Sequence, residues 1–362
     1  MSFYLKQIQL INFRCYQNRT FKFAPGKNLI VGTNAVGKTS LMEGIYCLGF
    51  AKTFRNVKDV DLINKGNSFY NLKGEFFNNG EIDKVISSYN QENKRIIKNN
   101  QIYKTISDYL GYFNIICFDP DDLELVKGGP SVRRKFLDVN IGQINHKYLN
   151  ALIKLKKILK ERNEYLKSVD INNFDKVLLD ILTTSLVKEA EIIISERKRF
   201  INELNTYLNP ILNQISSQRE NVEIVYKPNC NVDKLWKTSQ EKVTQDIIMQ
   251  TTTWGPNRDE VLILVNGEIA ANYCSQGQIR STCLTIKLGL VEMIKKITDR
   301  IIVILDDVFS ELDCHRQNEI VKMLDNNIQT FITTTSIQSL NNNIISESNV
   351  VEIERGNDDE RI

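Results

Sequence analysis

A glycine-rich segment near the N-terminus combines residue types and a spacing that bind phosphate. It fits the pattern G-x-x-x-x-G-K-[ST] and consists of Gly32, Thr33, Asn34, Ala35, Val36, Gly37, Lys38 and Thr39. Glycines let such a loop wrap tightly, so that amides at the start of the next helix point at phosphate oxygens. We expect Lys38 to reach the β- and γ-phosphates and the Thr39 hydroxyl to coordinate Mg²⁺. The segment therefore predicts a site for a nucleoside triphosphate with Mg²⁺.

Two adjacent carboxylates follow an apolar run late in the chain. The run Ile301–Leu305 ends directly before Asp306 and Asp307. In a phosphate-binding fold, Asp306 at the tip of a strand is expected to hold Mg²⁺, often through water. Asp307 would face the γ-phosphate and orient the attacking water as general base, with Lys38 as the second catalytic residue. Two aspartates after a strand are also common as a helix cap, so this prediction depends on their pairing with the glycine-rich loop.

A serine and a glycine open the long helix predicted from Gly277 to Ile297. The segment that contains them is Cys274-Ser275-Gln276-Gly277-Gln278. A helix N-terminus with a hydroxyl and accessible amides is an anion site, although a plain serine N-cap would look the same. Because Lys38 already marks one such site, a second implies either a second nucleotide or a phosphate shared across a dimer.

Alternation and buried runs predict the strands and the helix that bring these groups together. Side chains alternate from Phe3 to Leu10, and Asn28–Val31 is a short buried run that Gly32 ends. The helix after the loop is expected over Lys38–Phe50. Further strands are predicted in the stretches 69–103, with hairpin turns at 78–80 and 90–93, and in 114–118, 261–265, 301–305 and 331–335.

Helical periodicity dominates the middle of the chain, from about residue 121 to residue 249. Its apolar stripes consist of Leu152, Leu155, Leu159 and Leu166, and of Ile181, Leu182, Leu186 and Ile193. We therefore predict an α/β protein with mixed sheets and flanking helices. Residues 1–118 and 251–362 are expected to form one discontinuous lobe, and 119–250 a mainly helical second lobe.

Composition excludes several classes of protein. The chain has 362 residues, of which 42% are hydrophobic and 25% charged, the values of a soluble globular protein. Its longest clean apolar runs, such as Ile301–Leu305, are too short to cross a membrane, and the N-terminus lacks the apolar stretch of a secretory signal. Seven cysteines without Cys-x-x-Cys spacing predict buried thiols in a reducing compartment. We expect a cytoplasmic protein without a membrane partner.

The three motifs, in this order, resemble an ABC-type ATPase head, and the chain more specifically resembles the RecF family of bacterial recombination and repair proteins. The segment Pro120–Asp138 matches the long signature of that family across nineteen positions. Leu10–Tyr16, Gly255–Asp259 and Ser310–Asp313 are similar to further RecF elements. The resemblance spans nearly the whole chain and implies a P-loop ABC-type ATPase head with a helical second lobe.

Several residue roles are implied by this resemblance. Arg14 matches an arginine that lies by the bound ATP in RecF and its SMC-like relatives. Ser310 and Asp313 match the D-loop at the dimer interface. The trans signature, which closes over the ATP of the opposite subunit, is matched by Ser275, Gln276, Gly277 and Gln278.

The resemblance also implies an activity and partners. RecF-like proteins form ATP-dependent homodimers, bind single- and double-stranded or gapped DNA, and hydrolyse ATP slowly as DNA-stimulated ATPases. They act with RecO and RecR to load RecA in recombinational repair, the SOS response and replication-fork maintenance.

Three departures from the usual ABC pattern matter. The stretch Phe331–Thr335 carries threonines where ABC heads usually have a histidine that senses the γ-phosphate, a feature that RecF-like proteins share. Asp307 stands where most heads have glutamate, and its shorter side chain predicts slow turnover. The glutamine of the Q-loop should lie near Asp119–Asp122, where only carboxylates occur, so its role stays unassigned.

Three other functions compete with a DNA-binding ATPase. A transporter's nucleotide-binding subunit should have the switch histidine, and a metabolic P-loop kinase has no use for the Ser-x-Gly-Gln helix. An SMC-like tether needs hundreds of residues of heptads, whereas the stripe at 152–166 is about two heptads long.

Basic residues gather in the segment 131–170. It holds ten Lys or Arg against four Asp or Glu, a local charge of +6, whereas the net charge of the whole chain is +3. A solvated helix surface would have the same pattern. In a DNA-binding family, the candidates for sequence-independent phosphate contacts are Arg133, Arg134, Lys154, Lys156, Lys157 and Lys160. Alternatively, Arg133 and Arg134 could tie the two lobes together.

Overall fold

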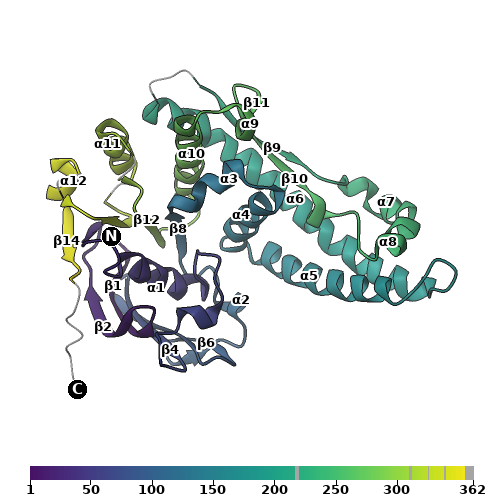
Figure 1. Ribbon diagram of the computed structural model, residues 1–362, viewed down its shortest axis with the longest axis horizontal. Helices are drawn as coiled ribbons and strands as arrows, with labels where there is room; N and C mark the ends of the chain where they lie inside the picture. Colours follow the sequence, from purple (N-terminus) through teal and green to yellow (C-terminus); the bar gives the residue numbers. More distant parts are fainter. Residues whose placement is uncertain (217–219, 310–311, 325, 338–339, 355–362) are drawn as a thin grey trace. The chain divides into compact units, whose positions relative to one another are not determined.

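The computed structural model describes residues 1–216, 220–309, 312–324, 326–337 and 340–354 (Figure 1). The chain divides into two compact units. The first unit contains Met1–Asp122, Gln214–Ser217 and Leu290–Ile362, and the second contains Leu123–Asn213 and Gln218–Gly289. The first is built on mixed sheets and the second is mainly helical, which confirms the predicted fold class.

The second unit extends further along the chain than the boundary predicted at residue 250. Strand β9 (Val222–Lys227) pairs with β10 (Glu260–Val265), which in turn pairs with β11 (Glu268–Ile269). Because these strands share hydrogen bonds, residues on both sides of 250 belong to one sheet. Helix α10 (Gln276–Lys295) follows, and the division between the units falls inside it.

An antiparallel sheet forms one layer of the first unit. Its register confirms the hairpins predicted at 78–80 and 90–93. Along β1 the side chains of Leu5, Ile8 and Leu10 are buried. In spatial order the strands are β2 (Tyr16–Lys22), β1 (Phe3–Phe13), β4 (Tyr70–Asn78), β5 (Glu81–Tyr89), β6 (Lys94–Lys98) and β7 (Gln101–Ile102).

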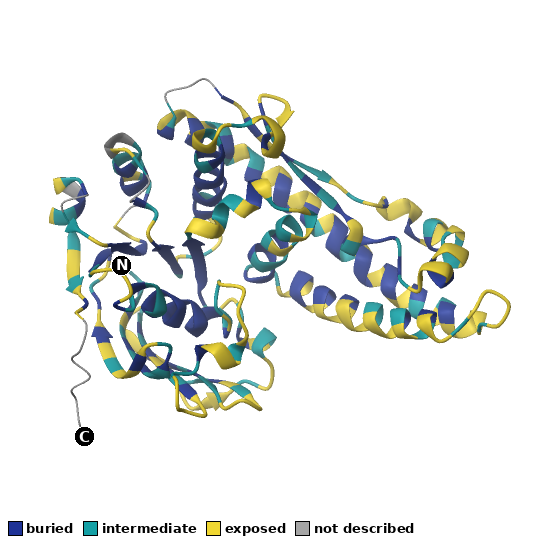
Figure 2. Ribbon diagram, viewed as in Figure 1, coloured by how far each residue is buried: buried dark blue, intermediate teal, exposed yellow. Residues whose placement is uncertain are grey.

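A parallel sheet forms the second layer of this unit. Its strands are, in spatial order, β14 (Ser348–Glu352), β3 (Lys27–Val31), β13 (Gln329–Thr334), β12 (Ile301–Leu305) and β8 (Asn114–Phe118). Figure 2 shows β8 and β12 as buried throughout, as expected for strands of a parallel sheet that is covered on both faces. Parallel strands end at the same edge, so this topology brings the carboxyl ends of β3 and β12 together.

Helix α1 (Lys38–Phe50) packs against both sheets of the first unit. Most of its residues are buried, and they join one hydrophobic cluster with β1, β4, β8 and β12. Gly44 permits the close approach, since a Cβ at this position would lie 2.8 Å from Leu10 Cδ2. The first turn of α1, which carries the predicted phosphate-binding residues Lys38 and Thr39, is therefore anchored by the core.

Shorter helices complete the first unit. They are η1 (Asp59–Leu62), α2 (Ile106–Tyr109), η2 (Pro120–Asp122), α11 (Cys314–Met323) and α12 (Asn342–Ser346). In the second unit the helices are α3 (Leu123–Lys127), α4 (Pro130–Gly142), α5 (His146–Lys167), α6 (Lys176–Ile215), η3 (Val232–Lys234), α7 (Leu235–Glu241), α8 (Val243–Met249), η4 (Pro256–Arg258) and α9 (Ala270–Tyr273). Among the described residues, no helix is both long and apolar enough to span a bilayer.

The predicted apolar stripes of the second unit are only partly correct. Leu152, Leu155 and Leu166 are buried, and so are Leu186 and Ile193. Ile181, in contrast, is 59% exposed. The inward position on this turn of α6 is taken by Thr183, whose hydroxyl accepts a hydrogen bond from the buried Arg162 Nε at 3.2 Å. A polar contact thus replaces the expected apolar one.

Asp83 is a buried carboxylate that makes the stability of the first unit depend on pH. Burial alone would raise its pKa, but hydrogen bonds from Tyr112, Asn99 and Asn78 and the charge of Lys98 outweigh burial, so its pKa is lowered from 3.8. A depressed pKa in the folded state stabilises the protein above the unfolded-state pKa, and this contribution is lost as pH falls through the folded-state pKa. The pH range in which this contribution to stability is lost therefore lies below about pH 4.

Replacing Asp83→Asn is expected to destabilise the protein at pH 7 by roughly 1–3 kcal/mol, because the ring of donors loses its charged acceptor. The variant should also lose less stability than the wild type between pH 4 and the acid transition. Urea unfolding at several pH values measures both effects. Parallel pH profiles for the two proteins would contradict the assignment.

Candidate nucleotide-binding site

The glycine-rich loop connects β3 to α1, which is the context that its phosphate-binding geometry requires. Val31 ends β3 and Lys38 begins α1. Gly37, at the N-cap, has a φ of 110°, which disfavours any residue with a side chain. A Cβ there would also lie 2.6 Å from Tyr16 Oη and 2.7 Å from Cys15 Sγ. The second glycine of the motif is thus required by both conformation and space.

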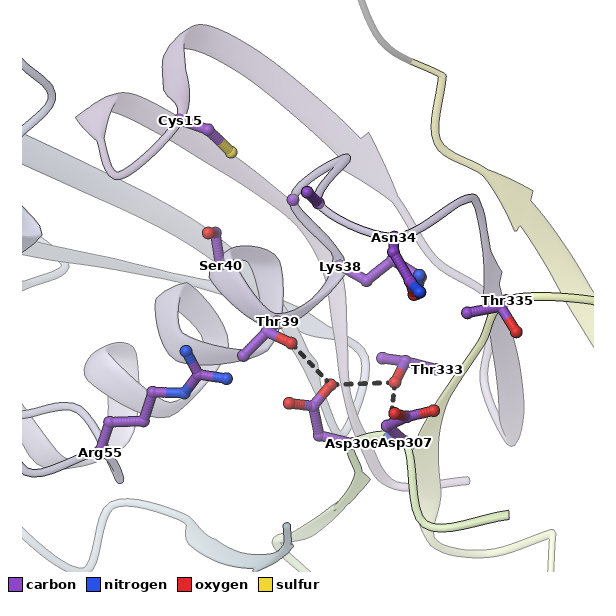
Figure 3. A pocket seen from close by; sticks show the side chains of 12 residues that line it. Cys15, Asn34, Lys38, Thr39, Ser40, Arg55, Asp306, Asp307, Thr333 and Thr335 are labelled. Carbon is purple, nitrogen blue, oxygen red and sulfur yellow. Dashed lines mark hydrogen bonds between the residues drawn. The ribbon is translucent and has the colours of Figure 1, made fainter. Parts of the chain in front are cut away.

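A cavity of about 330 Å³ lies in front of this loop, in the first unit (Figure 3). Its volume lies at the lower end of the range for small-molecule sites. It is lined by Cys15, Asn34, Ala35, Gly37, Lys38, Thr39, Ser40, Arg55, Asp306, Asp307, Thr333 and Thr335. The cavity therefore brings five of the eight predicted loop residues together with the two predicted carboxylates, while Gly32, Thr33 and Val36 do not line it. Thr39 and Asp306, which meet here, are 267 positions apart in the sequence.

Lys38 lies across its own loop. Its Nζ donates hydrogen bonds to the carbonyl oxygens of Gly32 at 2.6 Å and Thr33 at 2.9 Å. Burial lowers the pKa of this ammonium group, while the charges of Asp307 and Asp306 oppose the shift. The backbone carbonyls hold the ammonium group at the mouth of the loop, where it can exchange them for phosphate oxygens.

Asp306 is 2% exposed and forms the centre of a hydrogen-bonded chain. Its Oδ1 accepts hydrogen bonds from Thr333 Oγ1 at 2.9 Å and from Thr39 Oγ1 at 3.3 Å. Burial raises the pKa of this carboxyl group, although the hydrogen bonds from Thr333 and Thr39 lower it. Asp307 is exposed and has a φ of 56°. The pair therefore consists of one buried carboxylate and one that faces solvent.

The donor set fits Mg²⁺. Thr39 and Asp306 offer a hydroxyl and a carboxylate whose oxygens already lie 3.3 Å apart. Mg²⁺ prefers such hard oxygen ligands and is usually bound by one or two carboxylates together with phosphates and water, not by a closed protein cage. The described part of the chain contains no cluster of three or more His, Cys, Asp or Glu residues that could hold a metal.

The structure gives Arg14 a different environment from the one that the resemblance implied. Its Nε and Nη2 bind the Glu43 carboxylate at 2.9 and 2.6 Å, and its Nη1 donates to the Asp61 carbonyl at 3.0 Å. Arg14 does not line the cavity, whereas its neighbour Cys15 does. Glu43 is 1% exposed, so the salt bridge anchors this turn to α1. Cys15 is exposed, contrary to the expectation of buried thiols, although Cys47, Cys117, Cys230 and Cys283 are buried.

Arg55 is a cavity residue that the sequence did not indicate. It follows α1 in a segment without a motif, and its charge lowers the pKa of Asp306 (Figure 3). Thr53 holds this segment in place: its Oγ1 donates to Glu43 at 2.7 Å and accepts from the Arg55 amide at 3.2 Å. No spacing rule connects Arg55 with the loop, so only its position in the fold identifies it.

The serine-glycine segment forms a reciprocal cap at the start of α10. The Gln278 amide donates to Ser275 Oγ at 3.3 Å, and the Ser275 amide donates to Gln278 Oε1 at 2.8 Å. This is the arrangement of a capping box. Gln278 Nε2 also donates to Glu220 at 2.9 Å. A Cβ at Gly277 would meet nothing within 4 Å, so this turn has open space beside it.

The remaining predicted residues differ in how far the structure describes them. Asp313 caps α11 and accepts the Arg316 amide at 2.9 Å. Ser310 lies outside the described residues. The Asp119 amide donates to Asp122 at 2.9 Å in a closed turn, and no residue of Asp119–Asp122 lines the cavity. The Q-loop role therefore stays unassigned.

The six basic candidates fall into two groups. Lys154, Lys156, Lys157 and Lys160 are exposed on α5, and each approaches a carboxylate at only 3.8–4.0 Å. Arg133, in contrast, donates to the Gly128 carbonyl at 2.6 Å and to Glu260 at 3.1 Å, and Arg134 donates to the Asp259 carbonyl at 2.7 Å. Burial lowers the pKa of Arg134. The two arginines therefore make contacts inside the second unit.

The long signature segment and the Gly255–Asp259 segment meet inside the second unit. Arg197 binds Asp138 Oδ1 at 2.8 Å and Asp259 Oδ2 at 2.9 Å, and its side chain is 3% exposed. Tyr148 donates to the same Asp138 oxygen at 2.6 Å. Removing one partner of such a buried pair leaves an uncompensated charge. These residues hold the second unit together.

A loop after β3, two carboxylates after another strand of the same parallel sheet and an antiparallel sheet over α1 define the ATPase head of the ABC type. The family model described as RecF/RecN/SMC N terminal domain matches residues 4–358. A DNA replication and repair protein RecF from Listeria innocua is 36% identical over 364 residues, which cover 98% of each chain. The chain belongs to the RecF family.

Solved structures agree with this assignment. The structure of the recombination mediator protein RecF with ATP in the RecFOR pathway superposes with a TM-score of 0.88, at 33% identity and 94% coverage of each chain. The Smc head domain from Pyrococcus furiosus, bound to the C-terminal domain of ScpA, superposes with a TM-score of 0.55 at 16% identity, covering 98% of this chain and 94% of that one. The second likeness concerns the fold alone.

Proposed function

We propose that the protein binds ATP with Mg²⁺ and uses slow ATP hydrolysis to control a homodimer that binds DNA during recombinational repair. The observation that carries this proposal is the cavity in which Lys38, Thr39, Asp306 and Asp307 meet. The likeness to RecF with ATP supports the choice of nucleotide. RecO and RecR, which load RecA on gapped DNA, are the proposed partners, and the cytoplasm is the proposed location.

The cavity residues divide the work of phosphoryl transfer. Lys38 and the amides at the start of α1 bind the β- and γ-phosphates, and Thr39 and Asp306 would hold Mg²⁺, which neutralises charge on these phosphates. Asp307, the exposed carboxylate, orients the attacking water and accepts its proton. We expect slow turnover, because aspartate reaches less far than glutamate. A kcat of many per second would contradict this expectation.

Dimerisation is proposed to supply the second half of the site. Ser275, Gln276, Gly277 and Gln278 would close over the γ-phosphate bound by the partner subunit. The open space beside Gly277 supports this role, since another molecule can approach the backbone there. Gln278 would have to exchange its contacts with Ser275 and Glu220 for the partner's nucleotide. Ser310 and Asp313 are proposed to lie along the same interface.

The decisive experiment compares DNA binding by the purified protein with ATP, with ADP and without nucleotide, while sedimentation reports the oligomeric state. We expect a dimer and tight DNA binding with ATP, but not with ADP or without nucleotide. Gapped, single-stranded and duplex DNA are compared in the same assay. A monomer that binds DNA equally in all three nucleotide states would exclude the ATP-controlled dimer.

The exposed lysines of α5 are the proposed DNA contacts. Changing Lys156, Lys157 and Lys160 to Glu should weaken DNA binding at least 10-fold at low salt and reduce the slope of log affinity against log salt by up to about three. ATP binding should be unchanged, since the cavity lies in the first unit. As control, Lys198, Lys234 and Lys237, which are also exposed in the second unit, are changed to Glu. Equal losses of DNA affinity in both variants would show that the net charge, and not a specific binding surface on α5, determines DNA binding.

A further inference from the structure

Thr333 is a buried residue on β13 that contacts the carboxylate of Asp306 and the backbone amide of Asp307. It is 1% exposed. Its Oγ1 donates to Asp306 Oδ1 at 2.9 Å and accepts a hydrogen bond from the Asp307 amide at 2.8 Å (Figure 3). A threonine hydroxyl has one proton to donate. Thr333 donates that proton to the buried Asp306 carboxylate, while its oxygen accepts the hydrogen bond from the backbone amide of the exposed Asp307.

The position of β13 explains why this residue reaches both groups. The strand lies between β3, which leads into the phosphate-binding loop, and β12, which leads into the carboxylates. Thr333 is paired with Ile30 of β3, and Ile332 is paired with Leu305 of β12. The next residue, Thr334, accepts the Gly32 amide at 3.3 Å. The end of β13 is therefore hydrogen-bonded to the first residue of the loop, to the Asp306 carboxylate and to the Asp307 amide.

Asp307 needs a partner for its backbone. Its φ of 56° lies in the left-handed region, which is unfavourable for an aspartate unless the surroundings hold it there. The hydrogen bond from its amide to Thr333 provides such a constraint. Because the side-chain direction follows from the backbone conformation, the same bond sets where the Asp307 carboxylate points in the cavity.

We propose that Thr333 is a positioning residue for ATP hydrolysis: through one hydroxyl it fixes the Asp306 carboxylate for the metal and aims Asp307 at the γ-phosphate. The inference rests on the proposed ATPase function and deepens it. In this role Thr333 acts through its two neighbours, Asp306 and Asp307. It also lies in the threonine-rich stretch that occupies the place of the usual switch histidine, which gives that stretch a role of its own.

The test compares two substitutions of Thr333. One keeps the volume of the side chain nearly constant, and the other keeps its hydroxyl. Thr333→Val removes the hydroxyl without leaving a cavity, whereas Thr333→Ser retains it. The control is Thr330→Val on the same strand. Thr330 is also buried, but its Oγ1 makes only a 3.5 Å contact with the Ile328 carbonyl. Three quantities are measured for each protein: affinity for a fluorescent ATP analogue without Mg²⁺, the Mg²⁺ concentration that gives half of its effect on that affinity, and kcat at saturating Mg²⁺-ATP.

Loss of a residue that orients a metal ligand usually costs 10- to 100-fold in metal affinity or activity. We therefore expect Thr333→Val to raise the half-effect Mg²⁺ concentration and to lower kcat by about this factor. Analogue affinity without Mg²⁺ should stay within about twofold, because the loop and Lys38 are untouched. Thr333→Ser should recover most of both losses, and Thr330→Val should behave as the wild type.

The outcomes separate this inference from the proposed function. A wild-type protein that neither binds nor hydrolyses ATP would overturn the proposed function itself. A wild type that hydrolyses ATP, with a Thr333→Val variant of equal kcat and Mg²⁺ dependence, would overturn the role of Thr333 alone. Equal losses in Thr333→Val and Thr330→Val would assign the effect to strand packing and would also overturn it. Failure of Thr333→Ser to recover activity would contradict the role of the hydroxyl.

Discussion

Replacing Lys38 by alanine is expected to abolish ATP binding at micromolar nucleotide. A hydrogen bond to a charged group contributes roughly 1.5–3 kcal/mol, so losing lysine contacts with two phosphates should weaken binding at least about 100-fold. The change also removes the hydrogen bonds from Nζ to the Gly32 and Thr33 carbonyls, but Gly37 and the anchoring of α1 in the core should preserve the shape of the loop. Equilibrium titration with a fluorescent ATP analogue, with Lys38→Met as a second variant, measures the loss.

The matched control for this prediction is Lys52→Ala. Lys52 follows α1 directly and is exposed, and it does not line the cavity. The Lys52→Ala substitution removes one positive charge from the same unit. The variant should bind the ATP analogue as the wild type does. Thermal unfolding without nucleotide should give similar midpoints for both variants. If Lys38→Ala still bound ATP within threefold of the wild type, the loop would not be the nucleotide site.

Replacing Ser275 by arginine is expected to leave ATP binding intact and to block the ATP-dependent dimer. The change removes the hydroxyl that caps α10 and places a bulky cation at the turn where Gly277 leaves open space. A cation at a helix N-terminus is also unfavourable with the helix dipole. Sedimentation with ATP should then show a monomer, while analogue titration gives the wild-type affinity, because Lys38 and its loop lie in the other unit.

Two further variants serve as controls for the expected loss of the dimer in Ser275→Arg. Thr184→Arg adds the same cation at an exposed position of α6 and should dimerise normally. Ser275→Ala removes only the hydroxyl and should weaken the dimer without blocking it. A Ser275→Arg dimer as tight as that of the wild type would show that this segment does not act in trans. A Ser275→Arg variant that also fails to bind ATP would place the segment in the subunit's own site.

Local spacing was sufficient to predict the glycine-rich loop. Gly32–Thr39 carries its geometry within eight neighbouring positions, and the amides that it presents belong to its own backbone. The apolar run Ile301–Leu305 likewise predicted a strand that ends at Asp306, and β12 confirms it. The pairing of the two motifs followed from a general property of parallel sheets, whose strands end at one edge.

Contacts between distant segments were beyond reach of such patterns. The contact between Gln278 and Glu220 joins residues 58 positions apart, and the pairing of β9 with β10 moved the boundary predicted at residue 250. Arg14 could be recognised from a motif, but its salt bridge with the buried Glu43 could not. Each of these contacts depends on a residue or strand that is distant in the sequence, and the local sequence does not identify it.

The family, the fold class and the phosphate-binding loop were therefore accessible from the amino-acid sequence, because each depends on neighbouring residues or on a long matching segment. The places of Arg55 and Thr333 in the cavity required the tertiary structure. Arg55 reaches it from a segment without periodicity, and Thr333 acts through hydrogen bonds with the Asp306 carboxylate and the Asp307 amide, which follow another strand. Such contacts form only once β3, β13 and β12 are aligned, since their geometry belongs to the sheet and not to any one segment.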